Sequence, residues 1–179
     1  TGGSNTAIGY FALTTNTTNG GNTAVGKSAL FACASANNTA VGAETADALT
    51  TGAQNTAVGR YALTNTTGGS DNAVVGYNAL ADNVNGGQNA ALGREALKAN
   101  TANSNTAIGY RSLYANTTGT CNVAVGKDAG LTITTNSGCT LIGHGAGQAN
   151  TVANITAVGN GALYANTTGT NNTAVGTGI

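Results

Sequence analysis

The sequence repeats itself every 16 or 17 residues, and this period constrains the fold more than any single residue does. Each copy ends its most regular segment with Asn-Thr-Ala-Val/Ile-Gly, as in residues 5–9, or with a close variant of it. The eleven motif glycines are Gly9, Gly26, Gly42, Gly59, Gly76, Gly93, Gly109, Gly126, Gly143, Gly159 and Gly176. A short fixed period is the signature of a repeat protein, in which each unit packs against its neighbours. We therefore expect residues 1–179 to form a single repeat domain.

A β-solenoid is the architecture that fits this period. About 17 residues are too few for a pair of helices, and Asn, Thr and Gly disfavour helix. The Thr-Ala-Val-Gly stretch alternates with period two, as a strand does. Each copy is predicted to be one coil: a strand, a bend at the motif glycine, a second short strand ending at Leu, and an Asn-Thr-Gly turn. The predicted fold is an all-β parallel β-solenoid (β-roll or β-helix) of about eleven coils, roughly 50 Å long at about 4.8 Å per coil.

The position directly before the motif glycine is aliphatic in every copy, which predicts a core column. With these residues pointing inward, the motif Thr shares their side, and the Asn, Ala and Gly columns point outward. The Asn column is expected to stack into a ladder of side-chain amides. The predicted core column is Ile8, Val25, Val41, Val58, Val75, Leu92, Ile108, Val125, Ile142, Val158 and Val175.

Composition excludes several classes of protein. Charged residues make up 7% of the chain and the formal net charge is zero, so the chain lacks the basic surface of a nucleic-acid-binding protein. No apolar run approaches the roughly 18 residues of a membrane-spanning segment. Two Phe, no Trp and no Met cannot fill a conventional globular core. The absence of an initial Met and of a leader is typical of a mature or excerpted segment.

Nothing in the sequence predicts catalysis or metal binding. His144 is the single His, and no acid or nucleophile stands at a meaningful spacing from it. The glycines follow the coil period rather than a phosphate-loop pattern, and there is no Cys-x-x-Cys motif. We therefore expect no enzyme activity, no metal site and no cofactor.

The position directly after the motif glycine collects basic and aromatic residues. Such a column could contact glycans or a partner protein by stacking and hydrogen bonding. The alternative is an exposed bend where long side chains shield the backbone. The candidate contact residues are Tyr10, Lys27, Arg60, Tyr77, Arg94, Tyr110 and Lys127.

Two further patterns concern covalent chemistry. Asn-x-Ser/Thr sequons are candidate glycosylation sites in an extracellular protein, although a chain rich in Asn and Thr also generates them by composition. Four sequons, at Asn16, Asn65, Asn116 and Asn166, occupy the same turn and predict a row of glycans. The complete set is Asn16, Asn37, Asn65, Asn116, Asn154, Asn166 and Asn171.

The chain has three cysteines. Cys121 and Cys139 are about one coil apart, which predicts a disulfide between adjacent coils. Cys33 lies in another coil and is expected to be free or buried as a small apolar residue.

The repeat resembles those of two kinds of surface protein. Residues 122–126, Asn-Val-Ala-Val-Gly, are similar to the head repeat of trimeric autotransporter adhesins, and residues 105–119 are similar to repeats of tail-fibre-like proteins. The coils here are longer than those of the adhesin head. The resemblance implies a left-handed parallel β-roll, often trimeric, in a surface-exposed fibre.

These observations predict a structural segment of an extracellular, cell-surface or virion-surface fibre. Its expected partner is itself, as a trimer packed laterally through the small outward residues or as a head-to-tail filament, because neither end carries a capping element. The alternative to such a filament is that the chain is an excerpt of a longer array. Two other functions stay open: an ice-binding solenoid and a glycan-binding adhesin head. An inward Thr column would argue against ice binding. No nucleic acid and no membrane insertion are expected.

Overall fold

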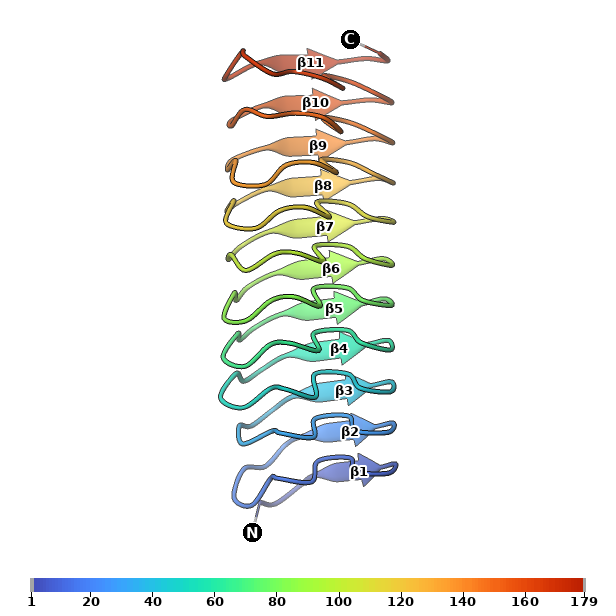
Figure 1. Ribbon diagram of the computed structural model, residues 1–179, viewed down its shortest axis with the longest axis vertical. Coiled ribbons are helices and arrows are strands. Elements are labelled where there is room, and N and C mark those ends of the chain that lie inside the picture. Colours follow the sequence, from blue (N-terminus) through green and yellow to red (C-terminus); the bar gives the residue numbers. More distant parts are fainter. Residues whose placement is uncertain (1, 179) are drawn as a thin grey trace.

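The computed structural model describes residues 2–178 and confirms the parallel β-solenoid (Figure 1). Eleven strands form one parallel sheet in sequence order, and the chain makes about ten turns between the first and the last. No helix occurs in residues 2–178. The strands are β1 (Thr6–Ile8), β2 (Thr23–Val25), β3 (Thr39–Val41), β4 (Thr56–Val58), β5 (Ala73–Val75), β6 (Ala90–Leu92), β7 (Thr106–Ile108), β8 (Val123–Val125), β9 (Thr140–Ile142), β10 (Thr156–Val158) and β11 (Thr173–Val175).

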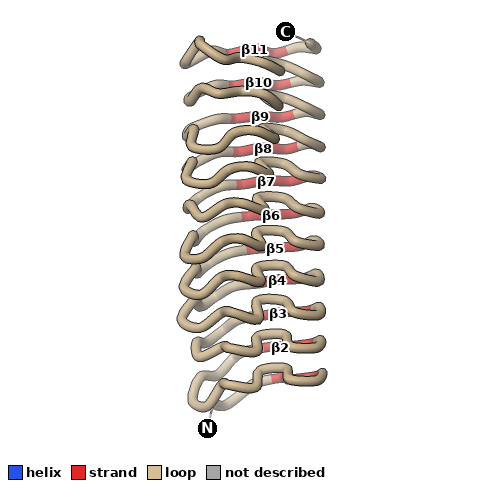
Figure 2. The backbone as a smooth tube through the Cα atoms, in the orientation of Figure 1, coloured by secondary structure: helices blue, strands red, loops and turns tan. Residues whose placement is uncertain are grey.

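Each coil contains one strand, so the predicted second strand is wrong. Figure 2 shows the sheet on one side of the coil and turns on the other. We call the turn segment, for example residues 27–37, the second side. There the residues two and four positions after the motif glycine have positive φ, as in Ser28 (55°) and Leu30 (50°). A residue with positive φ cannot continue a β-strand. The second side still bonds to its neighbours, since the Leu30 amide donates to the Thr45 carbonyl at 3.1 Å.

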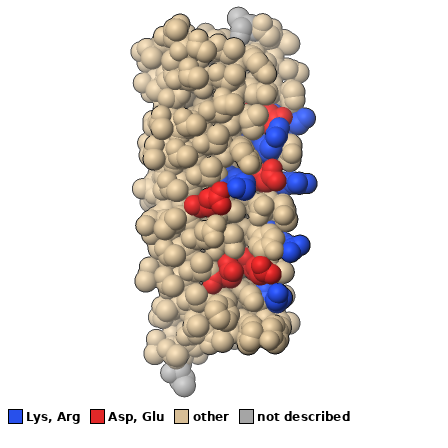
Figure 3. Space-filling view, in the orientation of Figure 1, with Lys and Arg blue, Asp and Glu red and all other residues tan. Residues whose placement is uncertain are grey.

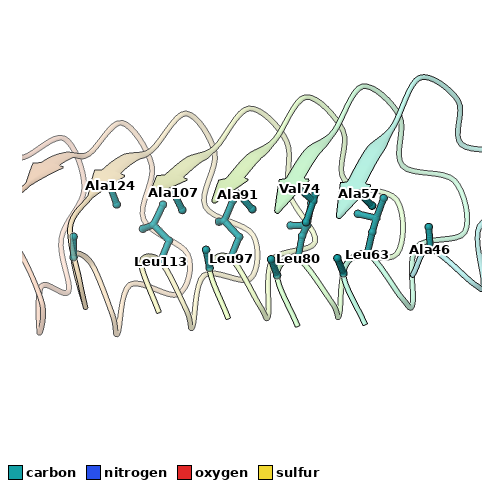
Figure 4. Packing of buried hydrophobic residues seen from close by; sticks show 14 of the residues in the cluster. Ala46, Ala57, Leu63, Val74, Leu80, Ala91, Leu97, Ala107, Leu113 and Ala124 are labelled. Atoms are coloured by element: carbon teal, nitrogen blue, oxygen red, sulfur yellow. The ribbon is translucent and has the colours of Figure 1, made fainter. Parts of the chain in front are cut away.

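The strands face the opposite way from the prediction. The middle residue of each three-residue strand points inward, and it is Ala in nine of the eleven strands. Figure 4 shows these alanines opposite the leucines of the second side, for example Ala91 and Ala107 opposite Leu97 and Leu113. Each of these four residues is fully buried. Because Leu already fills the thin interior, only a small strand residue fits across from it.

The predicted core column therefore lies on the outside of the sheet. Ile8, Leu92 and Ile108 are 61%, 48% and 39% exposed. The corrected residues are Ile8, Val25, Val41, Val58, Val75, Leu92, Ile108, Val125, Ile142, Val158 and Val175, each exposed or half-buried.

Large and small residues compensate for each other within the core. The second side carries Gly130 and Gly147 where most coils have Leu, and Leu141 takes the place of a strand Ala between them. A Cβ atom added at Gly130 or at Gly147 would lie 2.7 Å from a Leu141 methyl group. Leu141 thus fills the volume that the two glycines leave.

The motif Asn side chains form the expected ladder, but inside the coil. The Oδ1 of Asn55 accepts a hydrogen bond from the backbone amide of Asn72 at 3.0 Å, and Nδ2 of Asn55 donates to the Gly69 carbonyl at 2.9 Å. The same pattern continues to Asn122, whose Oδ1 accepts from the Cys139 amide at 2.9 Å. We call this column the Asn ladder. It links each coil to the next beneath the sheet, and it ends where Cys139 replaces Asn.

The motif glycine is required where one coil passes closely over the next. Gly26 has φ of 134°, and a Cβ atom there would lie 2.4 Å from the Gly42 carbonyl oxygen. The other ten motif glycines also have positive φ. Neither the conformation nor the space admits a side chain.

Candidate functional site

The outward residues of the strands form a flat surface, which we call the sheet face. It consists of the first and third residue of each strand, Thr and an aliphatic residue in most coils. Strand pairing keeps each column in register, so that Thr39 lies beside Thr56 and Val41 beside Val58. No strand contains a charged residue. The sheet face is therefore uncharged and repeats its chemistry in most coils.

The second surface is the aromatic–cation edge, the column directly after the motif glycines. All seven of its predicted contact residues, Tyr10, Lys27, Arg60, Tyr77, Arg94, Tyr110 and Lys127, are exposed as expected. Cations and rings alternate along it: the Arg94 guanidinium lies 5.4 Å from the Tyr77 ring centre and 6.0 Å from that of Tyr110. The Arg60 guanidinium lies 4.5 Å from the ring centre of the adjoining Tyr61. Such contacts hold the cations over the rings.

The charge that this edge presents to solvent is mainly positive. The side chains of Lys27, Arg94 and Lys127 are 61%, 62% and 57% exposed. The carboxylates that pair with Arg94 and Lys127 are more buried: Glu95 is 17% exposed and Asp128 is 8% exposed. Figure 3 shows most of the Lys and Arg side chains along the right-hand edge of the molecule and the Asp and Glu side chains further in.

The structure contradicts the predicted row of glycans. Asn116 is fully buried, and its Nδ2 donates to the Gly119 carbonyl at 2.9 Å and to Asn100 Oδ1 at 2.7 Å. The amides of Asn16 and Asn166 close the same turn by donating to the carbonyls of Asn19 and Gly169. A glycan on such a nitrogen would displace these bonds. The exposed sequons are Asn37, Asn65, Asn154 and Asn171.

The predicted disulfide between Cys121 and Cys139 is also wrong, because both thiols are free. Cys121 stands five residues before its motif glycine and is exposed, whereas Cys139 stands four before its own and is buried. A shift of one residue places the side chains on opposite sides of the chain. Burial raises the pKa of the Cys139 thiol. Cys33 is buried and free, as expected.

The sequence pattern did not predict a second column of buried amides. It lies seven residues after the motif glycine and includes Asn83, Asn100 and Asn150 as well as the sequon residue Asn116. Asn83 closes its turn by donating from Nδ2 to the Gly86 carbonyl and accepting from the Gly86 amide, both at 2.8 Å. Aligning the copies at this position would have revealed the column. Most of its hydrogen bonds close the turn, so the column is structural, although Oδ1 of Asn116 and of Asn150 has no partner within residues 2–178.

Other kinds of site find little support. Among residues 2–178, no group of three or more His, Cys, Asp or Glu side chains could hold a metal ion. No helix in this range is long and apolar enough to cross a membrane. One shallow, open hollow lies beside Tyr164 and Gly178, with a mixed polar and apolar lining. The two extended surfaces are thus the candidate functional features.

No protein-family model matches the chain, and comparisons with curated proteins and with solved structures find no significant match.

Proposed function

We propose that the chain is a structural segment of an extracellular or virion-surface fibre. The supporting observation is that three columns of hydrogen bonds connect successive coils along the long axis of the molecule. They are the strand ladder, the amide-to-carbonyl bonds of the second side, and the Asn ladder. A bend would have to stretch bonds in at least one of them. Stacked coils of this kind derive their stability from their neighbours, which suits a rod that bears load along its length.

The similarity of residues 122–126 to adhesin heads and of residues 105–119 to tail-fibre-like proteins supports the same function. Two modes of assembly are open to the rod. Lateral association, including a trimer, would cover the half-exposed aliphatic residues of the sheet face. Head-to-tail stacking would continue the ladder at β1 and β11, each of which pairs on one side in this chain.

Electron microscopy and analytical ultracentrifugation test this proposal. The expected particle is elongated, with a frictional ratio well above that of a sphere and a length of about 50 Å for each copy of residues 1–179. Lateral assembly would give a discrete oligomer, and head-to-tail stacking a distribution of longer rods. A compact, near-spherical monomer would contradict the rod and with it the fibre.

A glycan-binding adhesin head is a second candidate, favoured by the alternating rings and cations of the aromatic–cation edge. Sugars stack on aromatic rings, and guanidinium groups bind their hydroxyl and acidic substituents. A glycan array should then show saturable binding that Arg94→Ala weakens. Asn160→Ala changes the same column at an uncharged position and should leave binding intact.

A further inference from the structure

The Thr hydroxyls of the sheet face are free, whereas several Thr hydroxyls of the second side are bonded to the protein. Thr begins eight of the eleven strands. Within residues 2–178, none of these eight hydroxyls makes a hydrogen bond to the protein. On the second side, by contrast, the hydroxyls of Thr101, Thr117 and Thr132 each donate to a carbonyl of the next coil at 2.9–3.0 Å. The strand hydroxyls therefore need a partner from outside the chain.

These hydroxyls are arranged in rows of constant spacing. Neighbouring strands lie about 4.8 Å apart, and their pairing places Thr6 beside Thr23 and Thr23 beside Thr39. The eleven arrows in Figure 1 run nearly parallel, with little of the twist usual in sheets. Flat sheets require extra support, which the Asn ladder gives beneath this one. The surface is a rigid grid of hydroxyl groups in one row and aliphatic groups in the next.

A second copy of the chain could not form a standard interface through this surface alone. Eleven strands of three residues make a face of about 50 by 10 Å, or roughly 500 Å², whereas a standard stable interface buries about 800 Å² per partner. A dry interface would also bury the free hydroxyls without partners, which costs free energy. The absence of charge disfavours an ionic partner. Water satisfies every hydroxyl.

We propose that the sheet face binds ice. The hydroxyl rows would hydrogen-bond to water molecules at the ice surface, and the methyl groups of the Thr and aliphatic columns would hold water in the spaces between rows. The spacing of the strands is close to the oxygen repeat along one axis of hexagonal ice, so that consecutive coils meet equivalent lattice positions. This inference depends on the sheet face alone and goes beyond the proposed fibre.

Thermal hysteresis and ice-crystal shaping in a nanolitre osmometer test the proposal. The wild-type chain is expected to lower the freezing point without an equal change in melting point, and to facet growing crystals. Thr56→Tyr places a ring within the longest run of Thr strands and should abolish most of this hysteresis. Thr135→Tyr is the matched control, because Thr135 is exposed on a turn away from the sheet face. Its hysteresis should equal that of wild type.

A gain-of-function variant makes the test independent of damage to the fold. Ala73→Thr with Ala90→Thr fills two gaps in the hydroxyl row and joins the Thr run of β1–β4 to Thr106. Thr suits an exposed strand position, and hysteresis should rise above wild type. Absence of hysteresis in wild type, or an equal loss in Thr56→Tyr and Thr135→Tyr, would overturn the proposal. If the same samples sediment as a trimer whose sheet face is covered by neighbouring subunits, the ice-binding proposal is also overturned. The fibre proposal would stand.

Discussion

The position of a polar side chain within the coil decides whether it is hydrogen-bonded inside the protein or exposed to solvent. Asn72 lies in the Asn ladder, where its amide group both accepts and donates inside the coil. Asn160 lies on the surface, one residue after a motif glycine. The same residue type thus has opposite consequences at two positions of the repeat, and the difference is measurable.

Asn72→Ala is expected to destabilise the protein by roughly 1–3 kcal/mol, because it leaves one buried group unpaired. That group is the backbone amide of Asn89, 3.0 Å from Asn72 Oδ1, whereas the Gly86 carbonyl, 3.0 Å from Asn72 Nδ2, keeps its hydrogen bond from Asn83. Urea denaturation followed by circular dichroism measures the loss. Asn160→Ala should cost no more than about 0.5 kcal/mol. Equal losses in the two variants would show that the Asn ladder does not stabilise the coil.

The cysteines give a second prediction at this scale. One thiol of the native protein, that of Cys121, should react rapidly with a thiol reagent, because it alone is exposed. Cys139 combines burial with a raised pKa, which lowers its thiolate fraction at neutral pH, and Cys33 is fully buried. Mass spectrometry of labelled peptides should find both unmodified until urea is added. Labelling of Cys139 at the rate of Cys121 would contradict the register described above.

At the scale of the element, the coil is defined by how its strand and its second side share a thin interior. Leu on the second side adopts a left-handed conformation, as at Leu113 (φ 48°), and reaches across to a strand Ala. When the second side has Gly, the large residue moves to the strand, as at Leu141. The core thus conserves volume between its two walls rather than residue type at one position.

A double-mutant cycle tests this exchange. Leu141→Ala should cost about 2–5 kcal/mol by leaving a cavity. Gly147→Leu alone should also destabilise, because its Cβ would stand 2.7 Å from a Leu141 methyl group. The double variant recreates the arrangement of the other coils and should recover most of the loss, giving a coupling energy of the order of 1–3 kcal/mol. Additive losses in thermal or urea unfolding would refute the exchange.

The sequence predicts the period, the strand positions and the parallel register, because a fixed repeat forces like residues to stack. It does not predict which side of a three-residue strand is buried, since Thr and Val alternate with Asn and Ala equally well in either sense. The width of the interior decides, and that width depends on Leu residues with positive φ, which periodicity does not reveal. The sequons fail for a different reason, which the spacing does reveal: Asn116 stands seven residues after its motif glycine and is buried, whereas Asn65 stands six after its own and is exposed. The one-residue offset between the two cysteines was visible in the spacing in the same way.

At the scale of the whole molecule, stability should depend on the number of coils rather than on any particular one. Backbone pairing connects only successive strands, from β1 to β11. Removing one complete period should therefore leave two coils that can pair with each other as successive coils do in the intact protein. The best place for such a deletion lies between Gly76 and Arg94, because the coils on either side both carry Leu and Asn at equivalent inward positions.

Deletion of residues 77–93 should yield a folded rod that is shorter by one coil, about 4.8 Å. Small-angle X-ray scattering measures the length, and the melting temperature should fall only modestly because one nearest-neighbour interface is lost. Deletion of residues 77–85, about half a period, is the control. It shifts every inward residue of the following coil out of register, so it should unfold cooperatively at a much lower temperature. If both deletions were equally harmful, the coils could not be interchangeable units, and the rod would depend on specific contacts at its centre.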